Sequence, residues 1–237
     1  MPAWEVNQPW DREQIRAYRT YVPRRVARFQ RLDQRFTCED LALELMIEFA
    51  AEHELPLLIA NGQYSRGIGP GSFEDLAELK RVALRTSAAI DILNPINTVE
   101  VEGTVEGDPR SLRRALPGDL IFLDYSERWN HIQVVTFVDG DGVEIAQGNL
   151  ESPCGALRLL FSDIGDPQDS CYAGYPIHDY AYDYQGIYSR DGHAVFANKS
   201  ARVRRWNFDG WNTAWEESDP RVRLNMAPPS RPGSGRR

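Results

Sequence analysis

One cysteine stands where nucleophilic chemistry is possible. Cys38 heads a run of apolar residues at the three- and four-residue steps of an amphipathic helix. These residues are Leu41, Ala42, Leu45, Met46 and Phe49. Thr37 followed by Asp40 is typical of a capping box, so we expect this helix to start at Thr37 and to end before Pro56. Free N–H groups and the dipole at a helix start favour a thiolate and can hold an oxyanion. The pattern predicts a cysteine nucleophile with a lowered pKa; the alternative is a buried structural cysteine.

A histidine and two amides further along the chain complete a possible triad. His131 opens a β-branched stretch, HIQVVTFV, directly after a polar loop, and could take the thiol proton and return it to a leaving amine. Gln147 and Asn149 follow the turn at Asp139–Gly142, and either could orient the imidazole. The alternatives are an ordinary surface or core histidine and a Gly-Asn strand end.

The length of the hairpin turn decides which face of the sheet these amides share. With a three-residue loop, residue 138 pairs with 142, Asn149 falls opposite His131, and Gln147 lies two residues along on the same face. A loop with an even number of residues would place both amides on the other face.

The order of these elements resembles that of cell-wall amidases and peptidases of the NlpC and CHAP types (CHAP: cysteine, histidine-dependent amidohydrolase/peptidase). In those families a helix begins at the catalytic cysteine, a "PGDL" turn and strand follow, and the next strand opens with the catalytic histidine. The corresponding segments here are Leu116-Pro117-Gly118-Asp119-Leu120, Asn130-His131-Ile132 and Gln147-Gly148-Asn149. The resemblance covers about residues 35–150. It implies a papain-like fold with Cys38 as nucleophile, His131 as base and Gln147 or Asn149 as the orienting residue.

Two departures from the family pattern affect the chemistry. Phe36-Thr37 and Glu39-Asp40 flank the cysteine in place of the Asp-Cys-Ser string common in NlpC-type enzymes. Gln147, the first of the two residues that could orient the imidazole, stands where the CHAP type has a glutamate. Gln147 therefore adds no negative charge that would stabilise an imidazolium.

Further residues near the triad are candidates for the oxyanion hole or the substrate groove. Gln34 could supply an oxyanion-hole amide, and Thr37 or Glu39 could supply backbone N–H groups instead. Trp129 and Asn130 flank the histidine and could line a groove.

Other chemistries find little support. Cys154, Cys171, His178 and His193 lack the close pairing of structural zinc ligands, so we expect no metal and no cofactor. Asp179, Asp183 and Asp191 could be the catalytic carboxylates of a glycosidase. We interpret them instead as scattered, solvated side chains.

The composition limits which partners and which cellular location we expect for this protein. The net charge of −8 on 237 residues argues against a nucleic-acid partner, because phosphate binding needs a basic face. No apolar run reaches the length of a membrane span, and the first ten residues lack the apolar core of a secretory signal. Three cysteines do not make a disulfide framework. We therefore expect a protein that is cytoplasmic when made, or exported without such a signal.

The chain divides into four parts by composition and pattern. We expect an N-terminal helical extension over 1–34, a papain-like catalytic core over 35–160, an aromatic-rich C-terminal extension or small lobe over 161–216, and a flexible tail over 217–237. The expected fold class is α+β, with the cysteine-bearing helix packed on a central antiparallel sheet. Helices are predicted near 11–31 and 73–90, and strands at 119–124, 131–138 and 143–147.

Three functions are consistent with these features. The first is a cysteine amidase or peptidase that cuts an amide bond in bacterial peptidoglycan, as an antibacterial effector toxin exported for instance by a type VI system, with an immunity protein as partner. The second is a cytoplasmic cysteine hydrolase, deamidase or acyltransferase that acts on a protein or a small amide. The third is a non-catalytic binding module in which Cys38 is buried and inert.

Overall fold

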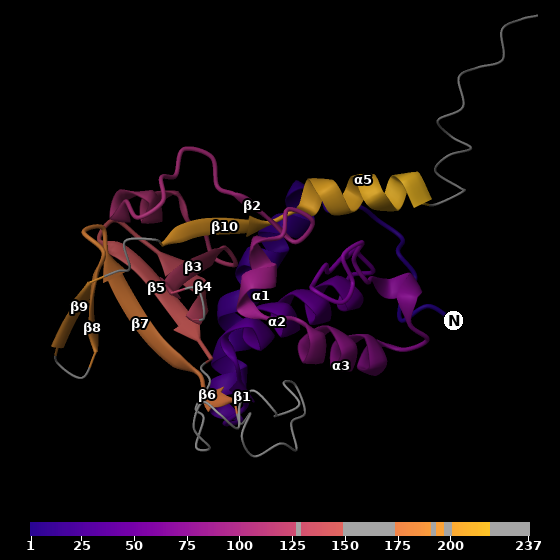
Figure 1. Ribbon diagram of the computed structural model, residues 1–237, viewed down its shortest axis with the longest axis horizontal. Coiled ribbons are helices and arrows are strands. Elements are labelled where there is room, and N and C mark those ends of the chain that lie inside the picture. The colour runs from indigo at the N-terminus through magenta and orange to yellow at the C-terminus, as the bar shows by residue number, and fades with distance from the viewer. Residues whose placement is uncertain (127–128, 149–173, 191–192, 197–200, 219–237) are drawn as a thin grey trace, which may run out of the picture.

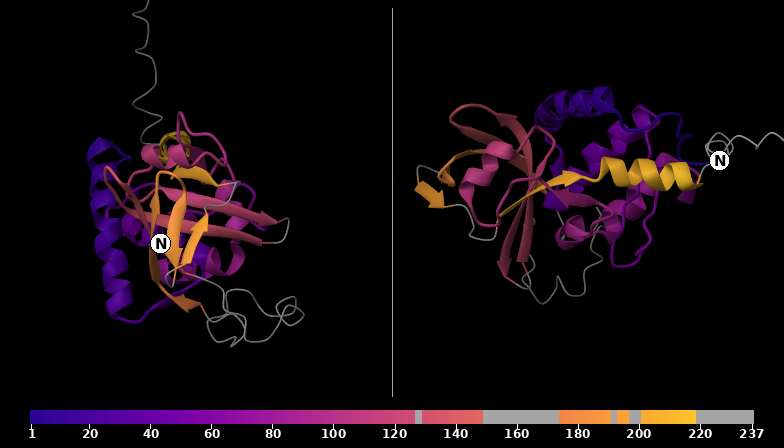
Figure 2. Two further views of the ribbon diagram at one scale, coloured as in Figure 1. Left: turned by 90° about the vertical axis from the view of Figure 1, so that its left-hand side faces the viewer. Right: turned by 90° about the horizontal axis from the view of Figure 1, so that it is seen from above.

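Helices and an antiparallel sheet make up the part of the chain that the structure describes. The computed structural model describes residues 1–126, 129–148, 174–190, 193–196 and 201–218. Most of the helical N-terminal part lies on one side of the sheet (Figures 1 and 2). None of the helices in these residues is both long and apolar enough to cross a membrane.

The cysteine-bearing helix is the centre of the helical layer. The described helices are α1 (Arg12–Arg31), α2 (Cys38–Glu52), α3 (Leu76–Thr86) and α5 (Phe208–Ser218), with the 3-10 turns η1 (Pro70–Ser72), η2 (Ala89–Leu93) and η3 (Pro109–Arg114). Thr37 is the N-cap of α2, and Cys38 is the first helical residue, so the predicted start is confirmed to within one residue. The amphipathic pattern was incomplete, because Leu43 and Ile47 are fully buried as well. Since α2 packs against α1, α3 and the sheet, it is buried on nearly every side.

The main sheet joins strands from distant parts of the sequence. Its strand order is β2-β10-β3-β4-β5-β7-β8-β9, and neighbouring strands are antiparallel. The bounds are β2 (Thr98–Glu100), β3 (Leu120–Ser126), β4 (Trp129–Val138), β5 (Gly142–Gln147), β7 (His178–Asp183), β8 (Ile187–Arg190), β9 (His193–Phe196) and β10 (Arg202–Trp206). A small second sheet pairs β1 (Arg35–Phe36) with β6 (Tyr175–Pro176). The expected helix on an antiparallel sheet is therefore present.

A β-bulge sets the register of the β4–β5 hairpin. Val138 pairs with Val143, so four residues form the loop, which is the even case. Continued without interruption, this register would place Gln147 opposite Val134 and turn it away from the face of His131. A bulge between Val135 and Phe137 shifts the register by one residue, so that Val134 pairs with Ala146. Gln147 consequently shares a face with His131.

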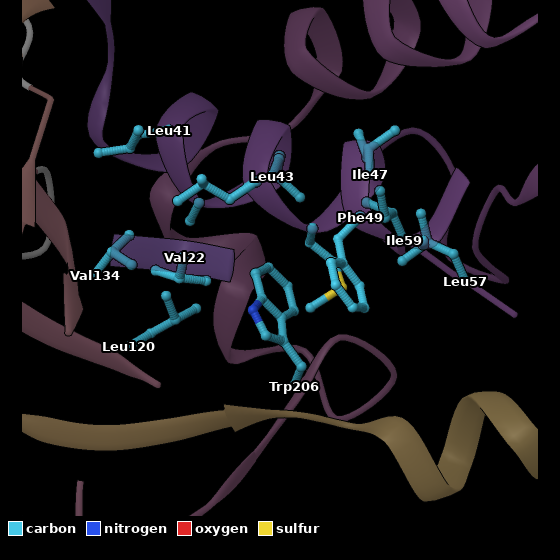
Figure 3. Close-up of a cluster of buried hydrophobic side chains, with 14 of the residues drawn as sticks. Val22, Leu41, Leu43, Ile47, Phe49, Leu57, Ile59, Leu120, Val134 and Trp206 are labelled. Atoms are coloured by element: carbon cyan, nitrogen blue, oxygen red, sulfur yellow. The ribbon is translucent and has the colours of Figure 1, made fainter. Parts of the chain in front are cut away.

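Two hydrophobic clusters cover the two faces of the sheet. The larger lies between the sheet and the helices and includes Leu41 of α2, Leu120 of β3 and Val134 of β4 (Figure 3). Trp206 of β10 belongs to it, next to an aromatic group around Trp10. The smaller cluster covers the opposite face and contains Ile121, Leu123, Val135, Val143, Ile145 and Tyr182.

The two ends of the chain both contribute to this core. Trp10 is buried and donates its indole N–H to the carbonyl of Pro56 at 2.7 Å. Strand β10 lies between β2 and β3, although its residues fall in the expected C-terminal extension. Arg205 of β10 forms a bidentate ion pair with Asp119 at the start of β3, with N–O distances of 2.7 and 2.6 Å. The residues outside 35–160 are thus part of the structure that supports the central sheet.

Candidate functional site

The start of α2 brings Cys38 to strand β4 of the sheet. Thr37 caps the helix by accepting a hydrogen bond from the backbone N–H of Asp40 at 3.3 Å, so the thiol projects from the first turn. Cys38 is 7% exposed. The start of α2 therefore holds Cys38, the one cysteine among the described residues, where little water reaches it.

A glycine at the end of β5 allows this close approach. A Cβ on Gly148 would lie 2.3 Å from the carbonyl oxygen of Phe36 and 2.4 Å from that of Thr37. Because real Cβ atoms do not come so close to backbone oxygens, no larger residue fits there without a shift of the backbone. Gly148, which the sequence presents as a simple strand end, is a point where two backbone segments touch.

The sulfur of Cys38 accepts a hydrogen bond from strand β4 next to His131. The backbone N–H of Ile132 donates a hydrogen bond to this sulfur. The recorded pairing of β4 with β5 reaches only as far as Val134 and Ala146, so this amide lies beyond the paired part of the hairpin. Since the N–H groups of a strand lie in the plane of its sheet, the thiol sits level with the strand backbone, one residue from His131.

A chain of hydrogen bonds orients the imidazole. His131 Nε2 lies 2.8 Å from Gln147 Oε1, and the same oxygen accepts a bond from Gln133 Nε2 at 2.7 Å. The oxygen of the Gln133 amide accepts from the hydroxyl of Tyr182 at 3.0 Å. This chain orients both amides with Gln147 Oε1 as the acceptor, so Nε2 of His131 carries the proton. In the neutral imidazole, Nδ1 is then left with a lone pair that can accept a proton.

Burial changes the pKa of both reactive groups. Burial, followed by the negative charge and hydrogen bond of Glu39, raises the pKa of the Cys38 thiol well above its usual value. The predicted lowering of this pKa by the helix start is therefore wrong for this conformation, because desolvation and the carboxylate outweigh the backbone N–H bonds. Burial also lowers the pKa of His131, against smaller opposite effects of Gln147 and Glu39. The imidazole is consequently neutral at pH 7, as a general base requires.

The thiol and the imidazole are close along the backbone but not bonded to each other. Between these two described residues the structure records no hydrogen bond. Instead the Cys38 thiol donates to Oε2 of Glu39 at 3.0 Å. In this resting arrangement the proton of the thiol points to the carboxylate, and a rotation about the side chain of Cys38 is needed to bring it to His131.

The other predicted residues occupy varied positions. Asn149 lies outside the described residues, so its orienting role stays a prediction. Gln34 is exposed, and its backbone N–H donates to the carbonyl of Phe29 at 3.0 Å at the end of α1. Asn130 is in β4 opposite Asp124, and Trp129 begins that strand, its side chain lying outside the description.

Three participating side chains were missed in the sequence. Gln133 stands two residues after His131, and strand alternation alone would have placed it on the same face. Glu39 was considered only for its backbone N–H, although its side chain contacts the thiol. Tyr182 gave no local signal, because its contact depends on the pairing of β7 with β5.

Metal binding and family membership find no support. Within the described ranges no three histidine, cysteine or acidic side chains are grouped so that they could hold a metal ion. Cys154 and Cys171 lie outside those ranges.

Comparisons of this chain with protein-family models, with curated proteins and with solved structures found no match.

Proposed function

We propose that this protein is a cysteine-dependent amidohydrolase with Cys38 as nucleophile and His131 as base. The observation that carries the proposal is the chain from Tyr182 through Gln133 and Gln147 to His131 Nε2. It assigns one tautomer to a half-buried imidazole and leaves Nδ1 as an acceptor, one residue away from the amide that donates to the sulfur of Cys38. A histidine held in this way has the form that a base needs beside a thiol.

The proposed reaction begins with the transfer of the thiol proton to His131 Nδ1. The thiolate then attacks the carbonyl carbon of the amide, and backbone N–H groups at the start of α2 stabilise the oxyanion. The imidazolium returns its proton to the amine as the C–N bond breaks. Water, activated by the neutral imidazole, hydrolyses the thioester and regenerates Cys38. The role of Gln147 is to hold the ring through Nε2 during these steps.

The substrate that we propose is the peptide part of bacterial peptidoglycan. This choice rests on the resemblance of the sequence to the NlpC-type and CHAP-type hydrolases, which is also why we propose a papain-like arrangement of the fold. An antibacterial effector with an immunity protein as partner follows from the same resemblance. A cytoplasmic protein or small amide is the alternative substrate for the same chemistry.

A non-catalytic module is the second candidate, and one observation favours it. The thiol of Cys38 is buried, and its pKa is raised rather than lowered. Such a thiol behaves as a small apolar side chain unless a bound ligand changes its surroundings.

Hydrolysis of purified sacculi tests the proposal. Soluble fragments released by the wild type would be identified by mass spectrometry and compared with those from Cys38→Ala and His131→Ala. We expect both variants to lose release. The control is His53→Ala, a histidine at the opposite end of α2, which should keep it. Equal release by Cys38→Ala would refute the proposal, whereas release from cell extract but not from sacculi would favour the alternative substrate.

A further inference from the structure

The carboxylate of Glu39 contacts the thiol of the candidate site, and its charge acts on the imidazole. Glu39 follows Cys38 in the first turn of α2 and is 8% exposed. Its Oε2 atom lies 3.0 Å from the sulfur of Cys38, and its charge acts on His131, where it opposes the lowering of the pKa by burial. A buried carboxylate that accepts a hydrogen bond from the candidate nucleophile acts directly on the charge of that thiol, which points to a role in the site.

We propose that Glu39 is a positioning residue that binds the Cys38 thiol in the resting site and then supplies, from helix α2, the negative charge that Gln147 cannot give to the His131 imidazolium. This inference rests on the proposed function of Cys38 and His131. It assigns to the helix the acidic group that the resemblance placed at the end of the second strand of the hairpin.

The charges around the site leave this task to Glu39. Gln147 and Gln133 face His131 from β5 and β4 with neutral amides, and the hydroxyl of Tyr182 on β7 stands behind them. The neighbouring acid, Asp40, has its pKa raised to about 8 by burial and by the charge of Glu39. Asp40 is therefore mostly protonated at pH 7 and contributes little charge there.

The proposed change on activation moves one proton and one hydrogen bond. The thiol proton, which now points to Glu39, passes from Sγ of Cys38 to Nδ1 of His131. The hydrogen bond from the thiol to Glu39 is thereby lost, and the carboxylate turns toward the imidazolium, with which it forms an ion pair. In the resting site the carboxylate disfavours the thiolate, which keeps Cys38 neutral until the proton can reach His131.

Two titrations of the intact protein test this role. The variants are Glu39→Gln, which keeps shape but removes charge, and Asp40→Asn, which changes the adjacent buried acid in the same way. The thiol pKa would be measured from the pH dependence of iodoacetamide labelling of Cys38, read by peptide mass spectrometry. The His131 pKa would be measured by NMR. We expect Glu39→Gln to lower both values, with thiolate at pH 7 rising about tenfold for each unit that the thiol pKa falls. Asp40→Asn should change them little.

The results that would overturn the inference are equally defined. They are a Glu39→Gln protein whose thiol and imidazole titrate as in the wild type, or an Asp40→Asn protein that shifts both as strongly. If Glu39→Gln does not fold, Glu39→Asp takes its place, because a carboxylate shorter by one methylene withdraws from the sulfur. An unchanged thiol pKa in Glu39→Asp would then overturn the inference.

These titrations need no substrate, so they separate this inference from the proposed function. If Glu39→Gln leaves the pKa values of Cys38 and His131 unchanged while the wild type hydrolyses its substrate, Glu39 alone has no role in the site. If Glu39→Gln lowers both pKa values but no hydrolysis depends on Cys38, the proposed activity is refuted and the Glu39 interaction stands.

Discussion

A glutamate in place of Gln147 should reverse the pH dependence that His131 gives to the stability of the protein. The two bonds recorded at Gln147 Oε1 come from donors, His131 Nε2 and Gln133 Nε2. Glutamate is isosteric with glutamine and accepts both bonds, so Gln147→Glu adds charge without removing a partner from this oxygen. The substitution therefore isolates the effect of a negative charge on the imidazole.

The magnitude follows from the position of the new charge. An opposite charge within hydrogen-bond distance of a histidine favours its charged form and raises the pKa by roughly 1–3 units. Each unit corresponds to about 1.4 kcal/mol of differential interaction, so the variant should gain roughly 1.4–4 kcal/mol of stability with His131 protonated. This range is large enough to measure by urea unfolding.

The signs in the two proteins are opposite. In the wild type the pKa of His131 is lowered in the folded state, so protonation opposes folding. Stability is therefore lost as the pH falls below the unfolded value of about 6.5 and through the folded pKa. In Gln147→Glu we expect the new charge to raise the folded pKa above the unfolded value, so that the added stability is complete below about pH 6.5 and is lost as the pH rises through the folded pKa.

The assay combines urea unfolding between pH 5 and 8 with NMR titration of the histidine ring. The protein has four histidines, and the signal of His131 is assigned by its loss in His131→Asn. Gln185→Glu, at an exposed position, is the control for a simple change in net charge. If the His131 pKa in Gln147→Glu is no higher than in the wild type, the close contact between His131 Nε2 and the side-chain oxygen at position 147 is wrong.

Two further predictions concern the supports of the site. Gly148→Ala places a Cβ within 2.3 Å of a backbone carbonyl oxygen and should cost about 1–3 kcal/mol in urea unfolding. Gly140→Ala, which has open space at its Cβ, is its control, and equal stability of the two variants would contradict the close contact. Asp119→Ala leaves Arg205 without its bidentate partner and should cost about 3–5 kcal/mol, because the carboxylate is 3% exposed. Asp108→Asn, which breaks an ion pair with an exposed arginine, should leave the unfolding midpoint unchanged, and a similar loss in both variants would refute the importance of burial.

Local signals in the sequence were sufficient for the elements that carry the candidate residues. The cap at Thr37 and the apolar spacing after Cys38 predicted the start of α2, because capping and periodicity depend on neighbours within one or two turns. The β-branched stretch after His131 and the Asp-Gly turn predicted the β4–β5 hairpin for the same reason. The packing of α2 on a central antiparallel sheet was expected from the resemblance of this order of elements to the NlpC and CHAP types.

The tertiary structure decided how these residues meet. The bulge between Val135 and Phe137, rather than the loop length, turned Gln147 toward His131, and no residue type marks that bulge in the sequence. Strand β10 lies between β2 and β3 in the sheet, although about a hundred residues separate it from β2 in the sequence. The pKa of Cys38 rose instead of falling, because burial depends on the segments packed around the thiol. The sequence by itself thus determined the local elements and their order, whereas register, desolvation and the partners of each side chain arise from contacts between distant segments, which only the folded chain brings together.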